Sequence, residues 1–254
     1  MIRAWLFDLD GTLVKTEMLK AISYAKAVIE LSASTVAEDQ VLNEFKNVVG
    51  RPRRDVAQAL VSVFNLEKAA LTRKAEFGVP TAWQAFVQIR LKYYAKMLED
   101  PAVILNNQWP HAIDLLRRAR ERRCKTALVT MSRCEQTMRI LEILSLQDKF
   151  DFIATRDDVE NGKPDPEIYH LALGELGVSA EESIALEDSP SGVRAALAAG
   201  VNVFAVSTPF TKKALHEGKL LPEEQIIDDP SQLANVLERF MTNHNPNNDQ
   251  GEVE

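Results

Sequence analysis

Five short apolar runs are spaced along the chain, and segments with a helical hydrophobic period separate them. The runs are rich in β-branched and aliphatic residues, which is typical of buried strands. They cover residues 2–7, 126–129, 150–154, 183–186 and 201–206. Buried strands that alternate with helices indicate a parallel sheet with helices on both faces. We therefore expect an α/β fold with a Rossmann-like core.

One long segment interrupts this alternation. Between residues 16 and 100 the helical period persists through 17–31, 37–48, 54–64 and 82–98, and no strand pattern appears. These residues predict an all-helical domain inserted after the first strand. The core then comprises residues 1–15 and 101–242, with hinges near 15–16 and 100–102. Residues 243–254 are polar and rich in Asn, which favours a disordered tail.

Two of the expected core helices have clear boundaries in the sequence. Asp165 and Ser189 are good N-cap residues, and a Pro follows each of them at the first helical position. Gly177 and Gly200 stand just past the far ends, where a left-handed residue commonly ends a helix. These signals predict one helix before Gly177 and another before Gly200.

The bulk properties exclude several classes of function. The chain has 254 residues, a net charge of −7 and a pI of about 5.3, without the basic footprint of a nucleic-acid binder. No apolar run approaches the ~20 residues that span a bilayer, and the N-terminus does not resemble a signal peptide. Cys124 and Cys134 lack metal-binding spacing and indicate a reducing compartment. We expect a cytoplasmic protein that binds neither nucleic acid nor membrane.

Polar side chains gather where the expected strands end. The site of an open parallel sheet lies at the carboxyl ends of its strands, so these positions indicate the chemistry. In chain order they are Asp8 and Asp10, then Thr130, Met131 and Ser132, then Lys163 in a loop before a helix, and finally Glu187 and Asp188. Acids, one lysine and hydroxyls should therefore meet at one edge of the sheet.

This combination suits phosphoryl transfer. Carboxylates at one edge repel one another unless a cation lies among them, and Mg²⁺ prefers carboxylate and carbonyl oxygens as ligands. The metal, Lys163 and the Thr130 hydroxyl would let a phosphate dianion approach. A carboxylate nucleophile can form an acyl phosphate, and a second carboxyl two residues on can protonate the leaving oxygen and later activate water. Gly11 permits tight backbone geometry beside the phosphate.

Each of these residues has a more ordinary explanation when taken singly. An Asp-x-Asp pair is often a solvated turn, Thr130 is more often a helix cap, and Lys163 is more often a surface lysine. Their conjunction favours a functional site, because all of them follow strand ends in a fixed order.

Four motifs then resemble those of the haloacid dehalogenase superfamily. They read FDLDGTL, LVTMS, GKPDPEIY and LEDSPSGVRAALAAG, and the resemblance extends over roughly residues 1–240. The chain is most similar to the branch with a helical cap, which holds β-phosphoglucomutase, phosphoglycolate phosphatase and small sugar phosphatases. The resemblance implies that the inserted helices form a cap that closes over the site and selects the substrate.

The resemblance also implies a role for each core residue. Asp8 becomes the nucleophile and Asp10 the acid/base. The implied metal ligands are Asp8, Asp10 through its backbone carbonyl, Asp188 and Glu187, and the implied phosphate-binding groups are Thr130, the backbone of Met131, and Lys163. Members that cleave carbon–halogen bonds lack the second aspartate, so Asp10 argues against dehalogenation.

Basic residues of the cap resemble positions that contact the substrate. Arg53 best matches the cap arginine with which the mutases grip a distal phosphate, and Arg51 and Arg54 flank it. Arg90 resembles a second basic cap position. Arginines at such places offer bidentate phosphate contacts, although a solvated basic face explains them equally well.

The sequence departs from the family pattern at three places. Lys15 stands where relatives usually carry an acid, and Lys20 replaces a histidine that helps to position the acid/base in the mutase. His111 stands where a Gly is common, and we expect it on the surface near a helix start. The loss of the histidine disfavours mutase activity.

We therefore expect a Mg²⁺-dependent phosphatase that hydrolyses a small phosphorylated metabolite, such as a sugar phosphate, as a monomer or homodimer. A hexose phosphate mutase is the main alternative. A catalytically silent member that binds a phosphorylated ligand or a protein remains open. Phosphonate cleavage would need an activated cap lysine. Lys15 or Lys20 could supply it by position, and no other feature of the sequence supports this reaction.

Overall fold

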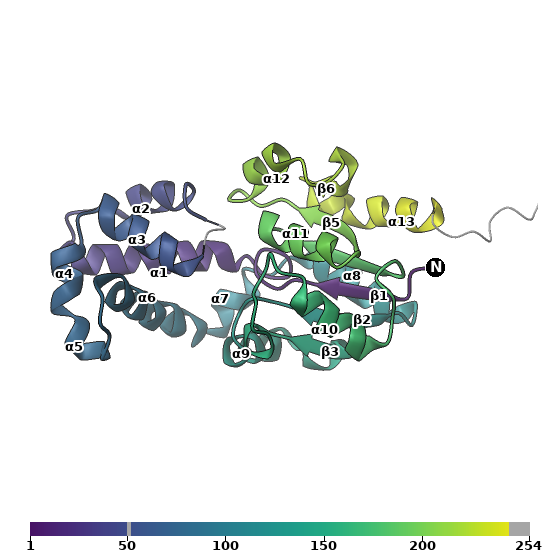
Figure 1. Ribbon diagram of the computed structural model, residues 1–254, viewed down its shortest axis with the longest axis horizontal. Helices are drawn as coiled ribbons and strands as arrows, with labels where there is room; N and C mark the ends of the chain where they lie inside the picture. The colour runs from purple at the N-terminus through teal and green to yellow at the C-terminus, as the bar shows by residue number, and fades with distance from the viewer. Residues whose placement is uncertain (50–51, 244–254) are drawn as a thin grey trace, which may run out of the picture. The chain divides into compact units, whose positions relative to one another are not determined.

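The computed structural model describes residues 1–49 and 52–243, which fall into two compact units (Figure 1). The core unit combines Met1–Lys15 with the chain from Asn107 onward, and the helical unit is Thr16–Asn106. The chain therefore passes between the units twice. The expected division fell at residue 100, whereas the contacts assign the short helix α7, Pro101–Leu105, to the helical unit.

A six-stranded parallel sheet forms the centre of the core unit, in the order β3-β2-β1-β4-β5-β6. The strands are β1 Ala4–Phe7, β2 Lys125–Val129, β3 Phe152–Ala154, β4 Ser183–Glu187, β5 Asn202–Val206 and β6 Ile226–Ile227. The predicted α/β, Rossmann-like fold is confirmed, and each of the five expected strands is present. The sequence did not reveal β6, which is two residues long.

Helices cover both faces of this sheet. They are α8 Pro110–Glu121, α9 Cys134–Leu144, α10 Glu167–Leu176, α11 Pro190–Ala198, α12 Lys212–Gly218 and α13 Leu233–Asn243. Successive residues of a strand point to opposite faces. Leu6 is buried in a cluster with Tyr169 of α10, whereas its neighbour Trp5 packs beside Leu115 of α8 and Leu237 of α13. Thus α10 lies on one face and α8 and α13 on the other.

The predicted helix boundaries hold at α11 and shift at α10. The Ser189 hydroxyl accepts a hydrogen bond from the Gly192 N–H at 3.1 Å, and Pro190 is the first helical residue. At α10 the helix begins at Glu167, because Asp165 accepts the Glu167 N–H at 3.0 Å and forms a turn before the helix. Both helices begin beside the carboxyl edge of the sheet, where the candidate residues lie.

The helical unit has its own core. Its helices are α1 Thr16–Leu31, α2 Glu38–Phe45, α3 Arg53–Val63, α4 Glu67–Thr72, α5 Lys74–Phe77, α6 Ala82–Leu98 and α7. Tyr24 of α1 packs against Phe45 of α2 and Phe86 of α6, with ring centroids 5.5 and 5.8 Å apart. The sequence predicted the four longer helices but missed α4, α5 and α7, which have six residues or fewer. Short helices offer too few turns for a period to be recognised.

The two segments that leave the core unit are paired with each other. The Lys15 N–H donates to the Asn107 carbonyl at 2.7 Å, and the Trp109 N–H donates to the Leu13 carbonyl at 2.8 Å. The Lys15 ammonium also lies 4.4 Å from the centroid of the Trp109 ring. The predicted tail, apart from Asn243 at the end of α13, lies outside the described residues.

Candidate active site

Asp8 and Asp10 lie in a tight turn that follows β1. The Leu13 and Val14 N–H groups both donate to the Leu9 carbonyl, at 3.0 and 3.1 Å. Gly11 has φ +88°, and a Cβ there would lie 2.1 Å from Asp188 Oδ2. Only glycine fits this position, because the backbone is left-handed and the carboxylate of Asp188 occupies the space of a side chain.

Lys163 is the cation of the site. Its ammonium donates to Asp8 Oδ1 at 2.8 Å, to Glu187 Oε1 at 2.6 Å and to the Val129 carbonyl at 2.8 Å. The side chain is only 3% exposed. An ammonium has three N–H donors, so all of them are used and its position is fixed between β1, β2 and β4.

Three carboxylates meet beside this lysine. Asp8, Glu187 and Asp188 are buried, and one oxygen of each lies within 4.8 Å of the others. Glu187 Oε1 also accepts the Tyr169 hydroxyl at 2.6 Å, whereas its Oε2 has no hydrogen-bond partner among the described residues. At Gly192 of α11 a Cβ would lie 1.9 Å from Glu187 Oε2, so the helix leaves room for this carboxylate only because glycine stands there.

The electrostatics of the cluster favour an additional cation. Burial raises the pKa of Asp8 to about 8, Lys163 opposes this rise, and Glu187 and Asp10 add to it. The pKa of Lys163 lies above its usual range: burial lowers it, but Asp8 and Glu187 raise it by more. When all three carboxylates are ionised opposite one ammonium, two negative charges remain, and a divalent cation would balance them. Buried oxygen donors of this kind fit Mg²⁺ or another hard divalent ion.

The end of β2 supplies the hydroxyl groups. Thr130 is fully buried, and its Oγ1 accepts the Ser132 N–H at 3.1 Å. Met131 lies against the lysine loop, where its sulfur accepts the Lys163 N–H at 3.4 Å. The Ser132 hydroxyl donates to Asp10 Oδ2. The strand-end position of Ser132 was visible in the sequence, but its contact with Asp10 was not.

The structure thus brings the core residues together. Asp8, Lys163, Glu187 and Asp188 share contacts, and Thr130, Met131 and Asp10 join them through Ser132 and Lys163. Among the departures from the family pattern, Lys15 lies over the Trp109 ring, and His111 is exposed in α8, as expected.

The cap residues belong to the helical unit and have different surroundings. Arg53 is exposed as the first residue of α3, and Arg51 lies outside the described residues. Arg90 is only 4% exposed, and its guanidinium carbon lies 4.9 Å from the Tyr24 ring centroid and 4.7 Å from that of Tyr94. Arg90 therefore packs inside its unit, which a basic surface pattern could not have indicated.

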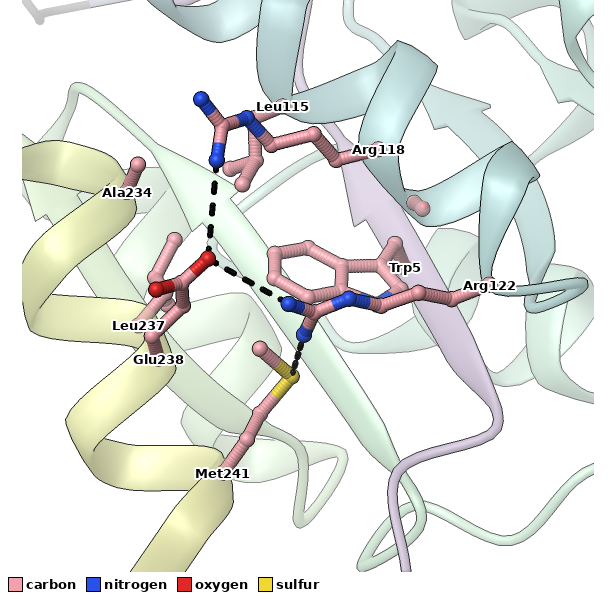
Figure 2. Close-up of a pocket in the computed structure, with 9 residues that line it drawn as sticks. Trp5, Leu115, Arg118, Arg122, Ala234, Leu237, Glu238 and Met241 are labelled. Atoms are coloured by element: carbon pink, nitrogen blue, oxygen red, sulfur yellow. Dashed lines mark hydrogen bonds and ion pairs between the residues drawn. The ribbon is translucent and has the colours of Figure 1, made fainter.

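A separate small pocket lies on the face of the sheet opposite α10, over Trp5 and between α8 and α13 (Figure 2). Glu238 pairs there with Arg118 at 3.5 Å and with Arg122 at 3.3 Å, and Arg122 also reaches the Met241 sulfur at 3.5 Å. Its volume of about 10 Å³ has room for about one water molecule. This pocket is a packing feature of the helix contact.

Along residues 1–49 and 52–243, no helix is long and apolar enough to cross a membrane.

Comparisons with known proteins give a consistent result. Residues 5–206 match the family model described as haloacid dehalogenase-like hydrolase. The phosphorylated carbohydrates phosphatase of Thermotoga maritima is 28% identical over 94% of this chain and 100% of its own length. The phosphoglycolate phosphatase of Salmonella typhimurium is 28% identical over 78% of this chain and 79% of its own. A Thermotoga maritima crystal structure, provisionally assigned as a β-phosphoglucomutase, superposes with a TM-score of 0.68 at 27% identity, covering 94% of this chain and 99% of that one.

Proposed function

Because the chain belongs to the haloacid dehalogenase-like hydrolase family, we propose that it is a Mg²⁺-dependent phosphatase that hydrolyses a small phosphomonoester through a phosphoryl group carried on Asp8. One observation carries this proposal: the Asp8 carboxylate is buried at the end of β1, held by Lys163, and grouped with Glu187 and Asp188. The phosphatase names of the relatives support the same reaction class.

Asp8, Asp188 and Glu187, with the backbone carbonyl of Asp10, are the residues that would hold Mg²⁺. Bound there, the ion would offset the negative charge of the acids and the phosphate. Lys163 contributes a fixed positive charge in addition, because its ammonium is held by Asp8, Glu187 and the Val129 carbonyl. The Thr130 hydroxyl and the backbone of Met131, at the end of β2, are the proposed contacts of the remaining phosphate oxygens.

The two aspartates of the turn divide the chemistry between them. An oxygen of Asp8 attacks phosphorus, a bond from Asp8 to phosphorus forms, and the ester bond to the leaving oxygen breaks. Asp10 gives its proton to that leaving oxygen. A water molecule then gives a proton to Asp10 and attacks phosphorus, which releases phosphate and restores Asp8. One acid thus changes its covalent state and the other its protonation state.

The substrate class follows from the relatives and the cap. Two relatives are named for phosphorylated carbohydrates and phosphoglycolate, so we propose a sugar phosphate or a similar small metabolite. Arg53 is the better of the two proposed cap contacts, because it is exposed. Arg90 lies buried between two tyrosines, and its proposed role is closer to shaping the cap than to gripping a ligand.

The test is phosphate release from a panel of phosphorylated metabolites, with and without Mg²⁺. Release should need the metal and should vanish in Asp8→Asn, while Asp148→Asn, a change at a core-unit carboxylate that is 74% exposed, should keep the wild-type rate. Wild-type activity in Asp8→Asn would rule out the nucleophile. Activity that is unaffected by removal of divalent ions would rule out the metal.

A hexose phosphate mutase is the second candidate, supported by the likeness to the structure assigned as a β-phosphoglucomutase. Lys20 stands in place of the mutase histidine, which disfavours mutase activity. An assay with β-glucose 1-phosphate and a bisphosphate activator separates the two functions. Isomerisation faster than phosphate release would favour the mutase. No turnover across the panel, together with ligand-induced stabilisation, would instead indicate a silent binding protein.

We also propose a cytoplasmic location and a monomeric or homodimeric state. Both cysteines are free thiols, which supports a reducing, cytoplasmic compartment. Asp8, Lys163, Glu187 and Asp188 all come from one chain, so we propose a monomer or a homodimer.

A further inference from the structure

Ser132 contacts the Asp10 carboxylate, and the proposed mechanism gives this serine no role. The Ser132 hydroxyl donates to Asp10 Oδ2, across 122 positions of the chain. Ser132 is 8% exposed and Asp10 is partly buried. The partner of Asp8 is different in kind, because Asp8 is held by the Lys163 ammonium.

The backbone of Ser132 is fixed on both sides. Its N–H donates to Thr130 Oγ1 at 3.1 Å, and its carbonyl accepts the Arg156 N–H at 3.0 Å, which joins the ends of β2 and β3. A side chain whose backbone is held at both ends has a defined direction. The hydroxyl therefore reaches Asp10 from a rigid strand end, not from a free loop.

A serine hydroxyl suits an acid/base better than a cation does. It can donate to a carboxylate, and after rotation it can accept from a carboxylic acid. Lys163 offers donors only, and its positive charge favours the ionised form of an acid. In the proposed reaction Asp10 loses its proton to the leaving oxygen and regains one from water, so its partner must serve both forms.

We infer that Ser132 is a positioning residue, which orients the Asp10 carboxyl in both protonation states so that it can exchange protons with the leaving oxygen and with water. The inference rests on the proposed function, because it gives Asp10 the acid/base role. It adds that the serine at this strand end acts through Asp10 and not only as part of the phosphate pocket.

The leaving group provides the test. A hexose 6-phosphate expels an alkoxide and needs the proton of Asp10, whereas 4-nitrophenyl phosphate expels a phenolate that is stable without one. Ser132→Ala should slow phosphoryl transfer from the sugar ester by roughly 10–100-fold, which is part of the ~10²–10⁴-fold that general acid catalysis contributes. The pre-steady-state burst of nitrophenolate should stay within about threefold of wild type, while later turnover slows because Asp10 also activates water. Equal loss of both transfer rates, or no loss in either, would overturn the inference.

Three further variants make the test specific. Ser132→Thr keeps a hydroxyl and should restore the sugar-ester rate to within about threefold, while a Thr variant as slow as the Ala variant would contradict the inference. In an Asp10→Asn background, Ser132→Ala should slow transfer from the sugar ester little further, since the two residues act as one unit. Rate losses of the two single variants that multiply fully in the double variant would count against the inference. Ser207→Ala is the matched control, because this buried hydroxyl donates to Asp228 at 2.6 Å and should leave the leaving-group dependence unchanged.

Asp8→Asn separates this inference from the proposed function. If Asp8→Asn keeps turning over either ester, the proposed function itself fails. If Asp8→Asn is inactive but Ser132→Ala affects both esters alike, only the role of Ser132 fails.

Discussion

Lys163 joins Asp8 to Glu187, and its side chain is almost completely buried. Removing one partner of a buried ion pair leaves uncompensated charge, which typically costs ~3–5 kcal/mol. We predict that Lys163→Met lowers the free energy of unfolding by about that amount at neutral pH and lowers activity by at least ~100-fold. Chemical denaturation and phosphate release measure the two effects.

Lys149→Met is the control for that change. Lys149 is 46% exposed and pairs with Asp148 on the surface, so its loss should alter stability by no more than ~0.5 kcal/mol. If Lys163→Met were as stable and as active as Lys149→Met, then the buried pair would have neither a structural nor a catalytic role.

His216 of α12 contacts two carboxylates. Its two ring nitrogens lie 3.1 Å from Asp228 and 2.8 Å from Glu223, and these contacts raise its pKa, that with Asp228 most. A group with a raised folded pKa stabilises the protein fully below its unfolded value, and that stability is lost as the pH rises through the folded value. The melting temperature of the wild type should therefore fall between about pH 6 and about pH 8.

His216→Gln and Asp228→Asn should both make that fall smaller, because each removes one side of the contact. Thermal melts at low ionic strength across this pH range measure it. If the melting temperature of both variants fell with pH as steeply as that of the wild type, the His216–Asp228 contact would not be the cause of the fall.

The sequence allowed the prediction of single residues where their chemistry is local. Asp8, Asp10 and Asp188 could be named because the end of each strand indicates where its residues will lie. Ser132 could not be assigned to Asp10, since that contact depends on how strands far apart in sequence pack. Arg90 was predicted as a cap contact of the substrate from the resemblance alone, and its position beside the Tyr24 and Tyr94 rings depends on how α1 packs against α6.

At the scale of elements, α10 and α11 each contain a glycine, and the two glycines have opposite surroundings. In α11 a Cβ at Gly192 would lie 1.9 Å from Glu187 Oε2, whereas in α10 nothing lies within 4 Å of a Cβ at Gly174. We predict that Gly192→Ala displaces Glu187 and lowers Mg²⁺-dependent activity by at least ~10-fold, through loss of a positioned metal ligand.

Gly174→Ala provides the matched control in the same type of element. It should keep full activity and stabilise the protein by up to ~1 kcal/mol, because alanine favours the helix and meets no neighbour. Activity titrations with Mg²⁺ and denaturant unfolding measure both variants. Equal activity of the two variants would show that the α11 start does not support the site.

The sequence revealed the elements that carry a recognisable pattern. The strands of three to five residues lie in short apolar runs, and the longer helices of the helical unit show the helical period. The strand β6 has two residues, and α5 has four, so neither carries a recognisable pattern. The start of α10 shifted because Asp165 forms a turn with Glu167 instead of capping the helix directly.

The chain divides into two units and passes between them twice. The segments that leave the core unit are tied by the Lys15–Asn107 hydrogen bond and by Lys15 over Trp109. Hinges need only a few residues at such crossings. We predict that the units move relative to each other when Mg²⁺ and beryllium fluoride, a phosphoryl mimic, are added.

Energy transfer between labels measures that motion. With Cys124 and Cys134 replaced by Ser, labels at Lys68→Cys of the helical unit and Glu175→Cys of the core unit should change their transfer efficiency on addition of the mimic. A pair at Lys149→Cys and Glu175→Cys, both exposed in the core unit, should not. An unchanged efficiency for the first pair, with the mimic bound, would contradict gating by the helical unit.

The proposed reaction depends on a phosphoryl group that passes through Asp8. Asp10→Asn should slow hydrolysis of the intermediate more than its formation from 4-nitrophenyl phosphate, so that the phosphoenzyme accumulates. Acid quenching within the first turnover, followed by peptide mapping, then locates the group. We predict a hydroxylamine-labile phosphoryl group on Asp8 and on no other residue. A nitrophenolate burst with no modified peptide, or with the phosphoryl group on another residue, would contradict the proposed reaction.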